Sequence, residues 1–208
     1  MTEPIKLAVM ISGGGTTLQN LIDKIDAGEL NASIEVVISS TSKARGLARA
    51  KKAGIPTRVA RTRDYPMIAD FADVNWNIAA KFGVDLVCFA GYLKLLPIRD
   101  DFDGKVMNIH PALIPVFCGQ GYYGHAVHKA VLDYGCKVSG CTVHFVDNVY
   151  DNGPIILQRT VPVRDDDTVE TLAARVFEQE CIAYPEAIRL FAEGRLTIEG
   201  RRVRVRQD

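Results

Sequence analysis

The sequence has no long uninterrupted apolar run, no excess of charge of one sign and no closely spaced pair of cysteines. No segment reaches the roughly 18 consecutive apolar residues of a transmembrane helix, and the N-terminus lacks the basic and apolar regions of a signal peptide. Lys plus Arg and Asp plus Glu number 25 each, so no global field favours nucleic acid or an anionic membrane. We therefore expect a cytoplasmic protein that binds neither.

The cysteines and histidines have no metal-site spacing. Five cysteines, an odd number without a CxxC pair, favour a reducing compartment over a disulfide framework or a zinc site. Four histidines include no HExxH pair, so we expect no metal. His125 and His128, three apart on an expected helix, are interpreted as surface or loop-packing residues.

Short apolar runs alternate with amphipathic segments in the first half of the chain. A helix capped by Thr16 or Thr17 follows the first run, and a short helical piece is expected near Leu96. This alternation predicts an α/β fold with an open, mostly parallel sheet and helices on both faces. The expected strands cover residues 5–11, 33–39, 57–60, 85–90 and 106–109, and further helices cover 43–53 and 67–81.

The second half contains longer strands and one long helix. Thr168 and Thr171 are candidate caps of that helix, and the tail alternates around Glu199 and Gly200 as an edge hairpin would. No repeat, low-complexity segment or linker divides the chain, so we expect one compact unit. Expected helices cover residues 126–134 and 168–193, expected strands 138–146 and 155–163, and the tail hairpin 196–205.

The stretch SGGGTT, residues 12–17, lies between an expected strand and an expected helix. Glycines allow backbone N–H groups to approach an anion, and a helix N-terminus adds unpaired donors, so a phosphate is a suitable ligand. The stretch is neither GxxxxGK[ST] nor a full GxGxxG, which gives little support to an NTPase or dinucleotide site. A tight turn that needs flexible residues is an equal alternative from this motif alone.

The stretch VMNIHPALIP places two polar residues at the end of an apolar strand. Asn108 and His110 are two apart, so they face the same side just where ligands bind in open α/β sheets. An amide donor and an imidazole suit an oxygen that becomes negative in a tetrahedral intermediate. For an isolated pair, capping of backbone groups ahead of Pro111 is the commoner explanation.

A loop rich in Asp and Asn follows the strand that ends near residue 146. The loop could deliver a carboxylate beside His110, which would orient the imidazole or relay a proton. The alternative is a turn in which Asp and Asn bond their own backbone. The sequence places no nucleophilic Ser or Cys with His110 and this carboxylate. Direct attack by a substrate amine is therefore a simpler mechanism than attack by a side chain of the protein.

Taken together, six motifs resemble the phosphoribosylglycinamide formyltransferase family, the folate-dependent transferases of purine synthesis. The resemblance covers nearly the whole chain in the right order and implies one formyltransferase domain, 1–208, with a Rossmann-like phosphate-binding half to about residue 104 and a folate-binding, catalytic half from about 105. The motifs are SGGGTTLQNLI, FAGYLKLLP, NIHPALIP, GYYGHAVHKAVL, SGCTVHFVD and YDNGPIILQ.

The resemblance implies transfer of formyl from 10-formyltetrahydrofolate to the amine of glycinamide ribonucleotide. Asn108 and His110 would polarise the formyl carbonyl and stabilise the oxyanion, with His110 as proton donor. Asp151 would keep His110 protonated and assist proton transfer from the attacking amine. His144 matches a histidine near these groups. The expected partners are these two small molecules, with a homodimer as a further possibility.

Binding residues also follow from the resemblance. Glu180 matches a carboxylate that contacts the ribonucleotide, and Arg63 a basic residue at the far side of the folate. The residues expected to hold the phosphate are Gly15, Thr16 and Thr17; those expected around the pteridine are Leu93, Lys94, Leu95 and Leu96, together with Asn108. The glycines of residues 119–124, GQGYYG, permit a mobile flap, and the sequence leaves open whether one forms.

The chain departs from the family pattern at three positions outside the catalytic three. Many members have Asn at Thr17, Ser at Ala112 and Gly at Asn152. Thr17 still offers a backbone N–H, and Ala112 follows the strand end. Of the three departures, Asn152 is expected to affect the site most, because it could alter the left-handed geometry of the folate loop. Asn nevertheless tolerates positive φ better than most residues.

Three related enzymes and one other class of protein are alternatives. A formyltetrahydrofolate hydrolase shares the Asn, His and Asp but carries an N-terminal regulatory domain, for which an expected first strand at Ile5 leaves no room. Methionyl-tRNA formyltransferase has a C-terminal tRNA-binding domain that the tail RRVRVR does not replace, and a sugar-nucleotide N-formyltransferase fits the phosphate loop less well. A non-catalytic nucleotide-binding module would not require Asn108, His110 and Asp151 to converge.

Overall fold

The computed structural model describes residues 3–207, which form two compact units, one up to Met107 and one from Asn108 onward. Strand β5 (Val106–His110) crosses the boundary between them. The organisation of the chain as one domain stays a prediction.

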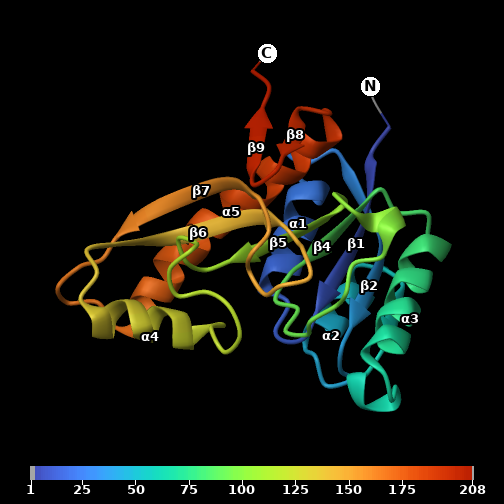
Figure 1. Ribbon diagram of the computed structural model, residues 1–208, viewed down its shortest axis with the longest axis horizontal. Coiled ribbons are helices and arrows are strands. Elements are labelled where there is room, and N and C mark those ends of the chain that lie inside the picture. Colours follow the sequence, from blue (N-terminus) through green and yellow to red (C-terminus); the bar gives the residue numbers. More distant parts are fainter. Residues whose placement is uncertain (1–2, 208) are drawn as a thin grey trace. The chain divides into compact units, whose positions relative to one another are not determined.

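Unit 1 is built on a parallel sheet, in which β1 pairs with β2 and β4, and β2 pairs with β3 (Figure 1). Every residue of β1 except Lys6 is buried, as its continuous apolar sequence predicts for a strand covered on both faces. The strands lie in the order β3 (Thr57–Val59), β2 (Ala32–Ser39), β1 (Ile5–Ile11) and β4 (Leu86–Phe89). The helices are α1 (Thr16–Asp26), α2 (Gly46–Lys52) and α3 (Ile68–Lys81), with 3-10 turns at Thr62–Asp64 and Asp100–Phe102.

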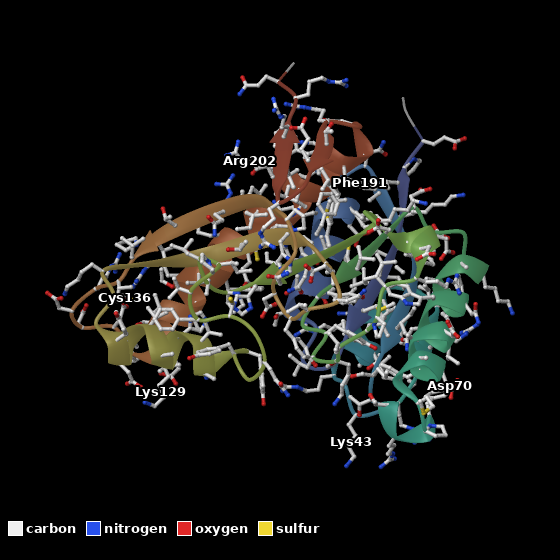
Figure 2. The ribbon with its side chains drawn as sticks, viewed as in Figure 1. Lys43, Asp70, Lys129, Cys136, Phe191 and Arg202 are labelled. Carbon is white, nitrogen blue, oxygen red and sulfur yellow. The ribbon has the colours of Figure 1, made fainter. Side chains whose placement is uncertain are left out.

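Trp76 anchors α3 in the core of unit 1. Its ring is fully buried and stacks on Phe102 at 4.9 Å between centroids, and its indole N–H donates to the Pro97 carbonyl at 2.7 Å. The polar handle of the ring is therefore satisfied while its apolar body is removed from water. Asp70 of α3 and Lys43 point outward from unit 1 in Figure 2, as their exposure requires.

Two local predictions in unit 1 were wrong. The N-cap of α1 is Gly15, in the left-handed region at φ 72°, and no side chain caps the helix, so neither Thr16 nor Thr17 has that role. No helix forms at Leu96, because the Pro97 ring disfavours helical backbone in the residue before it. The helical turn comes later, at Asp100–Phe102, and Leu96 is instead buried in an irregular segment.

Unit 2 consists of a mixed sheet and two helices, α4 and α5. Strand β6 pairs antiparallel with β7, β7 pairs parallel with β9, and β8 and β9 form the expected antiparallel hairpin at the sheet edge (Figure 1). The elements are α4 (His125–Tyr134), β6 (Val138–Phe145), β7 (Ile155–Pro162), α5 (Val169–Ala192), β8 (Leu196–Glu199) and β9 (Arg202–Val205). The predicted α/β class, with a mostly parallel sheet, is confirmed.

Helix α5 has the predicted caps, and α4 buries one of its faces. Thr168 accepts a hydrogen bond from the Thr171 N–H, and Thr171 Oγ1 accepts one from the Thr168 N–H at 2.9 Å, which forms a reciprocal capping box at the start of α5. In α4, Val127 and Val131 are buried, while Lys129 points away from β6 and β7 (Figure 2).

Candidate active site

The end of β5 brings Asn108 and His110 into unit 2, and the segment after them is fixed to β6. Thr142 Oγ1 donates to the Ala112 carbonyl at 2.6 Å and accepts from the Ile114 N–H at 3.1 Å. Both contacts are buried, so they exchange little with water and hold the backbone beyond His110 in one place. Ala112 thus contributes through its backbone.

The loop between β6 and β7 supplies Asp151. Gly153 is essential to the path of this loop, because a Cβ there would lie 1.9 Å from the Phe145 carbonyl oxygen. Asp147 bonds the Val149 N–H and the Asn152 side chain, so the predicted Asx turn does exist. The left-handed residue of the loop is Asp151, at φ 50°, and not Asn152, which corrects the expected consequence of that departure.

Asp151 joins the two residues from β5. Its Oδ1 accepts from Asn108 Nδ2 at 3.2 Å, and its Oδ2 lies 3.5 Å from His110 Nδ1. The same Oδ2 accepts from the Gly119 N–H at 2.9 Å. The side chains of His110 and Asp151 are only 5% and 12% exposed, so solvent weakens their attraction little.

His110 has an acceptor at each ring nitrogen. Nε2 lies 2.9 Å from the Phe117 carbonyl oxygen, and Nδ1 faces the Asp151 carboxylate. A carbonyl and a carboxylate accept but do not donate, so an N–H at either ring nitrogen would have an acceptor in front of it. Phe117 and Asp151 are the non-glycine residues with positive φ among residues 3–207, and each conformation costs about 1–2 kcal/mol. Such strain clusters at functional sites.

Burial of His144 favours the neutral imidazole, whose Nε2 can accept a hydrogen bond. Burial lowers its pKa, its Nδ1–H donates to the Phe145 carbonyl at 2.7 Å, and its Nε2 therefore accepts from Asn108 Nδ2 at 3.1 Å. This pattern fixes the orientation of the Asn108 amide, because its NH2 group lies between two acceptors.

Glu180 is a buried carboxyl on α5. Burial raises its pKa to about 8, and none of the described residues donates a hydrogen bond to it or forms an ion pair with it. Cys141 of β6 shares this environment, and its pKa rises to about 12, first through burial and then through the Glu180 charge. No hydrogen bond or ion pair links Glu180 to Asn108, His110 or Asp151 within the described part of unit 2.

In unit 1, the glycine loop is fixed to α2. The Gly46 N–H donates to the Gly13 carbonyl at 3.1 Å, and Arg49 Nε donates to the Gly14 carbonyl at 3.0 Å. A Cβ on Gly15 would lie 2.6 Å from the Gly46 Cα, so only glycine allows this approach. Thr16 and Thr17 begin α1, where backbone N–H groups lack helical partners.

The segment expected to surround the pteridine adjoins this loop in unit 1. The Leu93 N–H donates to Ser12 Oγ at 2.9 Å. Leu93 and Lys94 are exposed and Leu95 is half-buried, whereas Leu96 is only 1% exposed. Arg63 lies in a 3-10 turn, and its side chain is 77% exposed.

Sequence reasoning missed the backbone contacts of Phe117 and Gly119. Every residue has a backbone carbonyl and every residue except proline has an N–H, so the side chains of these two positions give no sign of this role. The one available signal was Gly119 itself, which opens the GQGYYG stretch and has φ 92°.

In residues 3–207, no cluster of three or more His, Cys, Asp or Glu side chains could hold a metal ion. None of the helices in this part of the chain has both the length and the apolar character needed to cross a membrane.

The profile of the formyl transferase family matches residues 5–188. The chain belongs to this family. A phosphoribosylglycinamide formyltransferase from Haemophilus influenzae is 40% identical over 93% of the chain and 90% of its own length. The trifunctional purine biosynthetic protein adenosine-3 of Gallus gallus is 42% identical over 95% of the chain. The chain spans 19% of the Gallus protein and 62% of the chloroplastic formyltransferase of Vigna unguiculata.

Solved structures of the formyl transferase family have the same fold. Glycinamide ribonucleotide transformylase 1 from Symbiobacterium toebii is 43% identical, with a TM-score of 0.90 over 100% of this chain and 96% of its own. A formyltetrahydrofolate deformylase from Pseudomonas syringae has a TM-score of 0.87 over 99% of this chain and 67% of its own, but its 22% identity indicates a shared fold alone. The resemblance to the phosphoribosylglycinamide formyltransferases is thereby confirmed.

Proposed function

We propose that the chain transfers the formyl group of 10-formyltetrahydrofolate to the amine of glycinamide ribonucleotide in de novo purine biosynthesis. The products are formylglycinamide ribonucleotide and tetrahydrofolate. The observation that carries the proposal is the convergence of Asn108, His110 and Asp151 within 3.2–3.5 Å. The Haemophilus relative, named for this activity, supports it over nearly its full length.

Catalysis begins with attack of the neutral amine on the formyl carbon. A C–N bond forms and the carbonyl electron pair moves to oxygen, which becomes an oxyanion. Asn108 Nδ2–H and the His110 N–H stabilise that charge. Acceptors in the chain orient both donors: the Phe117 carbonyl lies at His110 Nε2, and His144 and Asp151 lie at Asn108 Nδ2.

Asp151 acts as the base for the proton that the amine loses. Its carboxylate accepts this proton directly or through one water, and its charge keeps His110 protonated until then. Collapse of the intermediate returns the oxygen electron pair to carbon and breaks the bond to N10 of the folate, which leaves with a proton donated by His110. Asp151 then passes the amine proton to His110, which restores both side chains. Water must be kept from the formyl group, because the same donors would stabilise attack by water.

The remaining residues of the proposal bind the two substrates. Gly15, Thr16 and Thr17 offer backbone N–H groups and the positive end of α1 to the ribonucleotide phosphate. Glu180 contacts the ribonucleotide. Folate is bound by Arg63, Asn108 and the segment of Leu93, Lys94, Leu95 and Leu96. A cytoplasmic location and a homodimer complete the proposal.

A product assay tests this function. Purified protein is incubated with 10-formyltetrahydrofolate, with and without glycinamide ribonucleotide, and the products are separated by chromatography. Formylglycinamide ribonucleotide formed only when the amine is present is the expected result. Formate released without the amine would indicate a hydrolase, and an absence of reaction in both incubations would support a non-catalytic nucleotide-binding module.

A further inference from the structure

Phe117 holds an unfavourable backbone conformation that serves His110. At φ 52° its Cβ crowds its own backbone, as in any residue other than glycine. This conformation directs the Phe117 carbonyl to His110 Nε2, at 2.9 Å. Two residues later, the Gly119 N–H donates to Asp151 Oδ2 at 2.9 Å. One short turn therefore contacts both members of the His110 and Asp151 pair through its backbone.

Two tyrosines contact the Phe117 ring edge-on. The Tyr122 ring lies 6.3 Å from it at an interplanar angle of 61°, and the Tyr134 ring lies 6.0 Å from it at 72°. Both arrangements are favourable for aromatic quadrupoles. The Tyr122 N–H also donates to the Gly119 carbonyl at 3.1 Å, which closes the turn that carries Tyr122.

Tyr134 has little other packing. It is the last residue of α4 and is 80% exposed, so its ring contributes little to the core of unit 2. Tyr123, next to Tyr122, is 55% exposed, and no ring contact to it is present among the described residues. The two contacts to Phe117 thus distinguish Tyr122 and Tyr134 from a neighbour of the same type.

We propose that Tyr122 and Tyr134 are positioning residues that hold Phe117 so that its carbonyl fixes the His110 imidazole. They offset the unfavourable conformation of Phe117 and act on the chemistry only through it. The Phe117 carbonyl then sets the ring orientation and keeps a proton on Nε2, while Gly119 restrains the Asp151 carboxylate. The inference rests on the proposed function for its catalytic readout, but the state of His110 can be observed without any reaction.

The test compares four variants with the full-length wild type. Tyr134→Ala and Tyr122→Ala each remove one ring contact. Tyr134→Phe keeps the ring and loses only the hydroxyl, and Tyr123→Ala removes an adjacent exposed ring. Steady-state kinetics give kcat and the KM for glycinamide ribonucleotide. Proton NMR of the protein without substrates gives the imidazole N–H signal of His110, which is assigned by its loss in His110→Ala.

We expect Tyr134→Ala and Tyr122→Ala each to lower kcat about threefold to tenfold, the usual size of one aromatic pair, with an unchanged KM for the ribonucleotide. The His110 N–H signal should be visible in the wild type and broadened by solvent exchange in both variants. Tyr134→Phe and Tyr123→Ala should keep the wild-type kcat and signal. A merely structural role for the tyrosines would lower the melting temperature without moving the N–H signal.

Wild-type kcat and an intact N–H signal in Tyr134→Ala would overturn the proposal, as would an equal loss in Tyr123→Ala. If Tyr134→Ala does not fold, Tyr122→Ala decides by the same two readouts. If the wild type transfers no formyl group, the proposed function fails, and the N–H signal alone then decides whether the tyrosines fix His110.

Discussion

The Asp151 carboxylate lies beside the His110 imidazole, with Oδ2 3.5 Å from Nδ1. The other carboxylate oxygen accepts from Asn108, so one acidic side chain links both donors of the site. Asp151 reaches this position with a left-handed backbone, at φ 50°, which the loop must hold against its conformational cost. We propose that the reaction depends on the place of Asp151 between the two donors and on its charge.

Replacement of Asp151 by Asn should lower kcat at least about 100-fold, because the amide is nearly isosteric but neither accepts the amine proton nor carries a charge beside His110. Steady-state kinetics measure the loss, and circular dichroism checks the fold. Asp147→Asn is the matched control, since Asp147 lies in the same loop and bonds Val149 and Asn152 instead. A kcat for Asp151→Asn equal to that of the control would contradict this role.

Replacement of His110 by Ala should reduce turnover far more than folate binding, because the imidazole acts on a charge that develops only in the transition state. We expect kcat to fall about 100-fold or more, with little change in the Kd of a folate analogue measured by fluorescence titration. His125→Ala, an exposed histidine at the start of α4, provides the control. Undiminished turnover in His110→Ala would show that our assignment of His110 is wrong.

Much of the fold could be predicted because its signals are local. The apolar sequence of β1 reports burial on both faces, and the pair Thr168 and Thr171 reports the start of α5 through side chains three residues apart. The same holds for Asn108 and His110, whose two-residue spacing at a strand end indicated a shared face. In each case the sequence itself carries the side chains that make the interaction.

The remaining features depend on tertiary contacts that no local pattern encodes. Gly15 replaces the expected threonine cap because Gly46 packs against it, and Gly46 is 31 positions away in the sequence. The positive φ of Phe117 goes against the preference of its residue type. Asp adopts positive φ more often than most residues, but nothing in the local sequence singles out Asp151 from Asp147. Burial of Leu96 was missed because a helix was expected where Pro97 prevents one.

Replacement of Gly153 by Ala should destabilise the loop that carries Asp151, because the added Cβ would lie 1.9 Å from the Phe145 carbonyl oxygen and the backbone must move. We expect a loss of about 2 kcal/mol or more in the free energy of unfolding, measured by urea denaturation, together with a lower kcat. Gly13→Ala controls for the substitution itself, since no atom lies within 4 Å of a Cβ there. Equal unfolding free energies for the two variants would refute the steric argument.

Glu180 should make the protein less stable as pH rises. Its pKa is about 8 in the folded chain against an ordinary value of 4.5, so between these values the unfolded state is ionised while the folded state still holds the proton. The free energy of unfolding should therefore fall by about 1.4 kcal/mol per pH unit across this window. The stability that the protonated Glu180 contributes is fully present only below about pH 4.5.

Glu180→Gln cannot ionise, so its stability relative to the wild type should increase from pH 5.5 to 8 in urea denaturation. Glu178→Gln, an exposed position on the same helix, should follow the wild-type curve. Parallel curves for Glu180→Gln and the wild type would show that Glu180 is ionised in the folded protein.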